Sequence, residues 1–95
     1  MSDMTFGCAI EEMKKGRICA RRGWNGEDMW VGHTPGVKSL PASSFWHPSA
    51  RAFAETNGGC ADVLPYFIMK TADGKILLGW LASQTDMVAE DWYIV

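Results

Sequence analysis

Hydrophobic and polar residues repeat with a helical period near the start of the chain. Apolar residues recur there every three or four positions, at Phe6, Ala9, Ile10 and Met13. This spacing places them on one face of a helix and the charged residues between them on the other. Thr5 can cap the start of the helix, and Gly16 can end it after Lys15. We therefore predict a helix between Thr5 and Lys15 that packs on a core through its apolar face.

Short runs of aromatic and β-branched residues predict strands in the rest of the chain. The predicted strands are residues 17–22, 29–32, 65–71, 75–78 and 92–95. Turn residues at 33–36 should end the second strand, and residues 72–74 should form a tight hairpin. The run from Tyr66 to Met69 does not alternate between apolar and polar. We therefore expect an antiparallel sheet buried on both faces, one by the N-terminal helix and the other by a second subunit.

Residues 37–62 are the least regular part of the chain, because prolines and a pair of glycines interrupt them. One helix is predicted there, from Ser49 to Thr56, with Ser49 as its cap and with Ala50, Phe53 and Ala54 as its buried side. His47 fits a surface or hydrogen-bonded histidine better than a metal ligand. A long excursion of this kind is typical of a lid or an interface arm.

A polar group near the end of the chain has the spacing of a helix start. Ser83 and Asp86 are three residues apart, as in a capping box, which predicts a short helical turn before the last strand. Together with Gln84 and Thr85 they would lie beside an indole, a setting that suits a ligand with a ring and anionic or hydroxyl groups. A capped surface turn flanked by two core tryptophans accounts for the same residues. Taken together, the elements predict an α+β fold: a small antiparallel sheet with an N-terminal helix, a short helix in the central excursion and a helical turn before the last strand.

Length, charge and cysteines narrow the class of protein. The 95 residues are enough for a single domain, residues 1–95, with ordinary globular composition. A net charge of −2 argues against a general nucleic-acid binder. The three cysteines are widely spaced and indicate neither a disulfide framework nor a zinc site, so no metal and no cofactor is expected. Neither a membrane span nor a secretion signal is visible, so we expect a cytoplasmic protein with no membrane partner.

Tryptophan is the unusual feature of the composition, with five in this short chain. Trp24 stands between two glycines at a predicted strand end, with Arg21, Arg22 and Asn25 close in sequence. Such a residue is well placed to project at a pocket mouth, although an aromatic that covers the sheet edge fits nearly as well.

Several motifs, read together, resemble the Thoeris anti-defence 2 family of small phage and prophage proteins. They are MTFGxA at residues 4–9, RGWNG at 22–26, MKTADG at 69–74, WLASQTDM at 80–87 and AEDW at 89–92. The resemblance implies a homo-oligomer, usually a tetramer, that acts as a sponge in the host cytoplasm. Such a protein binds the cyclic ADP-ribose isomer made by a TIR-domain enzyme, in some relatives also cyclic dinucleotides, and keeps it from its effector without cleaving it.

The chemistry of such a ligand suggests roles for residues that also have ordinary structural roles. Trp24 and Trp80 would stack on the base. Asn25, Gln84 and Asp86 would meet ribose hydroxyls, and Ser83 and Thr85 would meet phosphate. Arg22 or Arg21 would bind phosphate, with Lys70 as the second choice; only one of the two arginines should do so, because successive strand residues face opposite ways. Trp92 and Tyr93 are expected in the core or an interface.

Two other classes of protein remain open at this stage. An enzyme that degrades a nucleotide signal would have to draw its acid, base or metal groups from a small set: His33, His47, Asp86, Glu90 and Asp91. No HxxxH, nucleophile elbow or phosphate-binding glycine loop accompanies them. A phage structural or interaction protein would explain the aromatic residues as interface, but it gives no reason for the polar group at 83–86.

Overall fold

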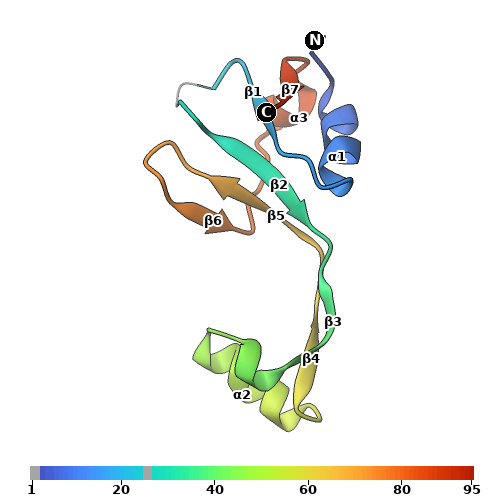
Figure 1. The fold of residues 1–95 in the computed structure, drawn as a ribbon, viewed down its shortest axis with the longest axis vertical. Coiled ribbons are helices and arrows are strands. Elements are labelled where there is room, and N and C mark those ends of the chain that lie inside the picture. Colours follow the sequence, from blue (N-terminus) through green and yellow to red (C-terminus); the bar gives the residue numbers. More distant parts are fainter. Residues whose placement is uncertain (1–2, 25–26) are drawn as a thin grey trace. The chain divides into compact units, whose positions relative to one another are not determined.

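The computed structural model describes residues 3–24 and 27–95 and has the predicted α+β architecture (Figure 1). Three α-helices, one 3-10 helix and seven strands make up this part of the chain. In order they are α1 (Phe6–Lys14), β1 (Cys19–Arg21), β2 (Trp30–Thr34), β3 (Val37–Pro41), η1 (Ala42–Ser44), α2 (Pro48–Thr56), β4 (Cys60–Val63), β5 (Tyr66–Lys70), β6 (Ile76–Leu78), α3 (Gln84–Val88) and β7 (Trp92–Ile94). Within these described residues, no helix is both long enough and apolar enough to cross a bilayer.

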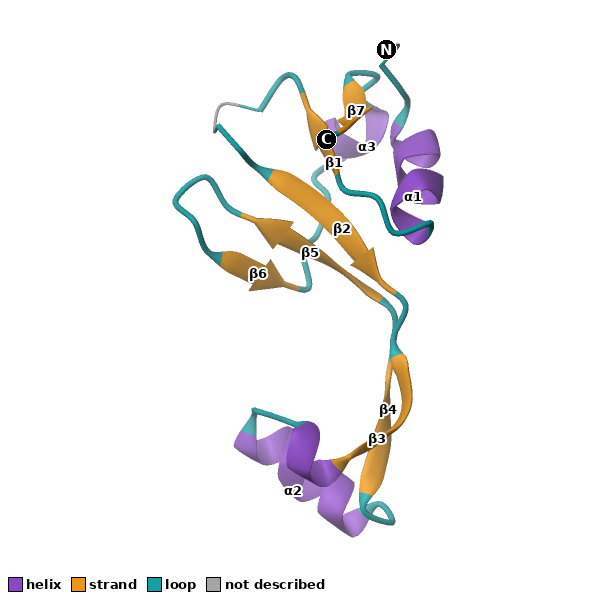
Figure 2. Ribbon diagram, in the orientation of Figure 1, coloured by secondary structure: helices purple, strands orange, loops and turns teal. Residues whose placement is uncertain are grey.

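The chain forms two compact units, which we call the body and the arm. The body combines Met1–Thr34 with Tyr66–Val95, and the arm is Pro35–Pro65. The body carries a five-stranded antiparallel sheet in the order β6-β5-β2-β1-β7 (Figure 2). The excursion predicted from its prolines and glycines is thus a unit with its own structure.

One face of the body sheet forms the core against α1. Residues paired across neighbouring strands line up in one row on this face: Leu77, Met69, Val31, Cys19 and Ile94. Ala9 and Met13 of α1 pack into the same buried cluster, together with Trp92. The predicted apolar side of α1 is therefore confirmed, as is its Thr5 cap, whose hydroxyl accepts a hydrogen bond from the Cys8 amide at 3.2 Å.

Within the body, α1 covers one face of the sheet only, and we call the opposite face the open face. Because side chains alternate along strands, it carries the neighbours of the core row. They are Ile18, Ala20, Trp30, Gly32, Ile68, Lys70, Ile76, Leu78, Tyr93 and Val95. Ile76, Leu78 and Val95 are 54%, 48% and 59% exposed. Thr34 and Tyr66, paired at the end of β2 and β5, lie on the same face. Apart from Lys70 and the hydroxyl groups of Thr34, Tyr66 and Tyr93, the open face is apolar, as expected from the Tyr66–Met69 run.

For the body, one predicted turn is wrong and one strand is shorter than predicted. Residues 33 and 34 do not turn but continue β2, because His33 pairs with Phe67 and Thr34 with Tyr66. The first strand is shorter than predicted and begins at Cys19. The hairpin after β5 is confirmed, since the Gly74 amide donates to the Thr71 carbonyl at 3.1 Å.

The arm contains a two-stranded sheet that the sequence pattern did not predict. β3 pairs with β4 through an irregular register between Val37 and Leu40, and Ser39 there has a positive φ of 53°. Gly36 precedes the pair with φ +85°, and a side chain at that position would collide with the Val63 carbonyl oxygen. Short strands interrupted by proline and a bulge lack the alternation by which strands are recognised.

The helix of the arm is in the predicted place but differs in its cap and its buried side. α2 is capped by His47, whose Nδ1 accepts from the Ser49 amide at 3.2 Å, with Pro48 in the first turn. The prediction of Ser49 as the cap is therefore wrong, because proline after His47 already fixes the first helical position. Ala54 is buried as predicted, but Phe53 is 59% exposed.

Candidate functional site

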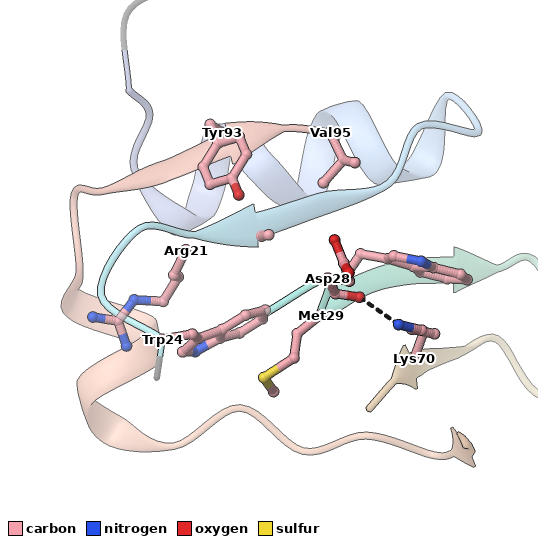
Figure 3. Close-up of a pocket in the computed structure, with 9 residues that line it drawn as sticks. Arg21, Trp24, Asp28, Met29, Lys70, Tyr93 and Val95 are labelled. Carbon is pink, nitrogen blue, oxygen red and sulfur yellow. Dashed lines mark hydrogen bonds between the residues drawn. The ribbon is translucent and has the colours of Figure 1, made fainter. Parts of the chain in front are cut away.

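The body has a cavity of about 280 Å³, which we call the body pocket (Figure 3). Its described lining consists of Ala20, Arg21, Trp24, Asp28, Met29, Trp30, Lys70, Tyr93 and Val95. Five of these residues also belong to the open face: Ala20, Trp30, Lys70, Tyr93 and Val95. The pocket therefore combines aromatic and apolar surface with two cations, on the side of the sheet that α1 leaves uncovered.

Arg21 reaches the pocket from the end of β1 and is held by two carboxylates. Its Nη1 donates to Asp86 Oδ1 at 2.7 Å, and its Nε donates to Asp91 Oδ1 at 2.8 Å. The arginine side chain is 12% exposed. Hydrogen bonds to Asp91 and then Asp86 raise the pKa of Arg21 despite its partial burial. Because two carboxylates face one guanidinium, Arg21 brings no surplus positive charge to the pocket.

The carboxylate of Asp86 connects the start of α3 to Arg21 and Trp24. Its Oδ1 accepts from Arg21 and from the Trp24 indole Nε1, the latter at 3.1 Å. Its Oδ2 accepts from the Ser83 amide, while its own amide donates to Ser83 Oγ, both at 3.1 Å. Burial alone would raise the pKa of Asp86, but hydrogen bonds from Trp24, Arg21 and Ser83 outweigh it and lower the pKa. The predicted capping box is confirmed, and both carboxylate oxygens are already occupied within the protein.

Asp91 fixes the turn that follows β1. Its Oδ2 accepts from the Gly23 amide at 2.8 Å, and its main-chain oxygen accepts from the Arg22 amide at 3.1 Å. The pKa of Asp91 is lowered, chiefly by the hydrogen bond from Arg21. The two aspartates thus hold Arg21, Gly23 and Trp24 in place from the other end of the chain.

Trp24 packs edge to face against two other tryptophans of the body, Trp80 and Trp92. The ring of Trp24 lies 6.3 Å from that of Trp80 and 5.3 Å from that of Trp92, measured between centroids. Trp92 is fully buried, as expected for a core residue, and its Nε1 donates to the main-chain oxygen of Asp86 at 3.0 Å. Trp24 lines the pocket, whereas Trp80 stands against Trp24 without belonging to the described lining.

The other residues predicted for the site are distributed more widely. Ser83 caps α3, which is only five residues long, and Gln84 and Thr85 are exposed at its start and outside the described lining. Arg22 points to a different partner from Arg21: its Nε donates to Asp3 at 2.7 Å, and its guanidinium lies 4.5 Å from the Tyr93 ring centre. Asn25 lies outside the described residues. The roles of these residues in ligand binding stay predictions.

The sequence reasoning missed part of the lining. Asp28, Met29 and Trp30 follow the RGWNG motif, and Tyr93 was expected in the core or an interface. Lys70 was only the second choice for phosphate, yet its Nζ is at the pocket, donating to the main-chain oxygen of Asp28 at 2.9 Å (Figure 3). The pairing of Lys70 with Trp30 across β5 and β2 brings these residues together. A register prediction for the two strands could have found it.

No set of three His, Cys, Asp or Glu side chains in the described residues is arranged to hold a metal ion. The cysteines are all free, with Cys19 buried and Cys8 exposed. What the body pocket offers is recognition chemistry: ring faces and edges for a planar group, an ammonium group for an anion, and a thioether and aliphatic groups for van der Waals contact.

The fold and the site together define a class of protein. It is a small α+β protein whose pocket lies on the open face of the sheet and is lined by aromatic and cationic side chains. The sequence model of the Thoeris anti-defense 2-like domain matches residues 4–95, and the chain belongs to this family. It is 36% identical over 98 residues to the protein named Thoeris anti-defense 2 from Bacillus phage SP01, with 97% of this chain and 94% of the relative covered. The resemblance found in the motifs is therefore confirmed, and family membership supports an anti-defence role for a phage protein.

Proposed function

We propose that the protein binds and sequesters a cyclic nucleotide immune signal in the host cytoplasm, and so blocks anti-phage defence without cleaving the signal. The ligand is a cyclic ADP-ribose isomer made by a TIR-domain enzyme, and a cyclic dinucleotide is a second ligand of the same chemistry. The observation that carries this proposal is the body pocket, in which Trp24, Trp30 and Tyr93 stand near Lys70.

The pocket chemistry suits such a ligand. A base stacked on an aromatic side chain contributes roughly 1–3 kcal/mol, and a phosphate is attracted by an ammonium group. Lys70 is the better phosphate partner, because its Nζ donates to an uncharged carbonyl, whereas Arg21 is neutralised by Asp86 and Asp91. Trp24 is held at a fixed angle by its hydrogen bond to Asp86, which reduces the entropy lost on binding.

The placement of the acidic and basic groups supports binding without cleavage. Asp86 and Asp91 accept hydrogen bonds from Arg21 and from main-chain or indole N–H groups, so they are poorly placed to take a proton from water. His33 lies in β2 against Phe67, and His47 caps α2 in the arm. In the described lining of the pocket, Asp28 is the one acidic side chain, whereas hydrolysis usually needs a paired acid and base.

We also propose that the working form is a homo-oligomer, a tetramer built from two dimers. The open face exposes Ile76, Leu78 and Val95, an apolar surface larger than isolated exposed residues produce. Covering this face with a second copy of the chain would also cover the body pocket, because the two share Trp30, Lys70 and Tyr93. Enclosure by a second copy would exclude water from the ligand and strengthen its polar contacts.

A release experiment tests the function directly. The protein is incubated with the cyclic ADP-ribose isomer, free ligand is removed by gel filtration, the protein is heat-denatured, and the supernatant is analysed by mass spectrometry. We expect the intact isomer in the supernatant. An altered product would show an enzyme instead, and an empty supernatant would show a protein that interacts without holding the signal.

A further inference from the structure

The arm is well ordered by local hydrogen bonds but has almost no core of its own. Arg51 Nη2 donates to the main-chain oxygens of Ser43 and Phe45, at 3.4 and 3.2 Å, and ties α2 to η1. The Ser39 amide donates to Asp62 Oδ1 at 2.8 Å. Within residues 35–65, all of which the structure describes, Ala54 alone is fully buried. Polar contacts therefore shape the arm without the apolar burial that normally stabilises a folded unit.

Large apolar side chains of the arm are exposed instead. Trp46 is 85% exposed, Phe53 59% and Leu64 80%. The two aromatic side chains alone expose on the order of 300 Å². A stable protein interface buries roughly 800 Å² on each partner, so these two residues supply more than a third of what a dimer needs.

A unit of this size usually needs an additional source of stability. Below about 40 residues, folded units generally depend on disulfides, metals or association. Cys60, the one cysteine in the arm, is free, and the described residues hold no metal-binding group of three. Association is the remaining source, and it accounts for the exposed aromatic residues as well.

We propose that the arm is an interface that docks against the arm of a second copy of this chain. The arm carries two basic residues, Lys38 and Arg51, and two acidic ones, Glu55 and Asp62. It is thus electrically neutral with His47 uncharged, and two copies meet without net repulsion. This neutrality argues against an anionic partner such as nucleic acid, which would need a basic surface.

The inference rests on the proposed oligomer and deepens it. A tetramer made of two dimers needs two different self-complementary surfaces on each chain, because a single two-fold interface closes at the dimer. The open face of the body is one such surface. The arm, centred on Trp46 and Phe53, is the second.

Light scattering on surface variants tests this assignment. The arm variant is Trp46→Ser with Phe53→Ser, and the open-face variant is Ile76→Ser with Leu78→Ser. Leu81→Ser is the control, since Leu81 is an apolar residue of the body that is at least as exposed as any of these four. We expect a tetramer for the wild type and the control, and half that mass for the arm variant. The open-face variant should also be halved in mass, and a chain with all four changes should be a monomer.

The arm changes should not unfold the chain, because both side chains are exposed in the single copy; far-UV circular dichroism checks this. Trp46→Lys is a second variant, which places like charges at the contact and should also halve the mass. An arm variant that keeps the wild-type mass, or a monomeric wild type, would overturn the inference. Ligand release from the wild type decides the proposed function separately, because a tetramer that retains no signal would overturn that function and leave the arm interface standing.

Discussion

The indole of Trp24 and the carboxylate of Asp86 are joined by a hydrogen bond of 3.1 Å across 62 residues of sequence. The same carboxylate oxygen accepts from Arg21. A helix cap, an ion pair and the orientation of a pocket residue therefore depend on a single side chain.

Replacing Asp86 should destabilise the body strongly. Asp86→Ala leaves Arg21 without one of its partners, leaves the Trp24 N–H unpaired and removes half of the capping box. Losses of this kind together cost about 2–4 kcal/mol. Urea unfolding followed by circular dichroism, at one protein concentration for all variants, measures the effect. Glu90→Ala, at an exposed position in the same segment, should change the free energy of unfolding by less than about 0.5 kcal/mol. A similar small change for Asp86→Ala would contradict the central position given to this carboxylate.

The lowered pKa values of Asp86 and Asp91 predict how stability depends on pH. A carboxyl group whose pKa is lower in the folded state binds fewer protons there than in the unfolded chain. Its contribution is therefore fully present above the unfolded pKa of about 3.9 and is lost as the pH falls through the lower folded value. We expect these two groups to leave stability unchanged between pH 5 and 7 and to reduce it below about pH 4. Urea midpoints measured from pH 7 to pH 2 should fall less steeply with acid in Asp86→Asn than in the wild type.

Removing an aromatic ring from the site should weaken binding and leave the assembly intact. Trp24→Ala is expected to lose about 1–3 kcal/mol of binding, which raises the Kd roughly 5- to 150-fold. The sequence-based prediction is the same loss for Trp80→Ala, and this variant tests whether the second ring also faces the ligand. Isothermal titration calorimetry with the cyclic ADP-ribose isomer measures both, and Leu81→Ala is the exposed neighbouring control. A change in assembly size would mean that the ring is a structural contact.

The cations near the pocket should differ in importance. Lys70→Met is expected to weaken binding about tenfold, because the ammonium group at the pocket is lost while most of the side chain's volume remains. Arg22→Ala should have a smaller effect than Lys70→Met, since Arg22 is engaged with Asp3 and reaches the pocket only through the ring of Tyr93. Calorimetry at low and high salt distinguishes a close contact from general attraction, which is screened beyond roughly 8 Å at physiological ionic strength. Equal losses for both variants that disappear in high salt would exclude a direct phosphate contact by Lys70.

The parts of the fold that were predictable from sequence are those set by neighbouring residues. The caps at Thr5 and Ser83 and the hairpin at Gly74 depend on residues within four positions of one another, and all three are confirmed. The His47 cap was missed because Ser49 has the more favourable side chain, and only the position of Pro48 distinguishes the two.

The site itself depended on distant pairs that local pattern could not reveal. Arg21 and Arg22 have similar sequence surroundings, yet one meets carboxylates 65 and 70 residues away and the other meets Asp3. The pocket residues Trp30 and Lys70 are brought together by the register of β2 and β5. Sequence alone also drew attention to the polar group at 83–86; Ser83 and Asp86 of this group bond to each other and to the end of β1, and their role in ligand binding stays a prediction.

The distribution of the tryptophans has an optical consequence. Trp92 is fully enclosed in the body, and Trp46 is almost fully exposed in the arm. Indole emission moves to longer wavelength and becomes quenchable by acrylamide when the ring meets water. The red, quenchable part of the emission should therefore report mainly on Trp46, and the blue part on the body, where Trp92 is enclosed and Trp24, Trp30 and Trp80 are half-buried. One spectrum of the unlabelled protein can thus follow both units. Quenching of the red component that falls as the protein is concentrated would show the arm becoming covered.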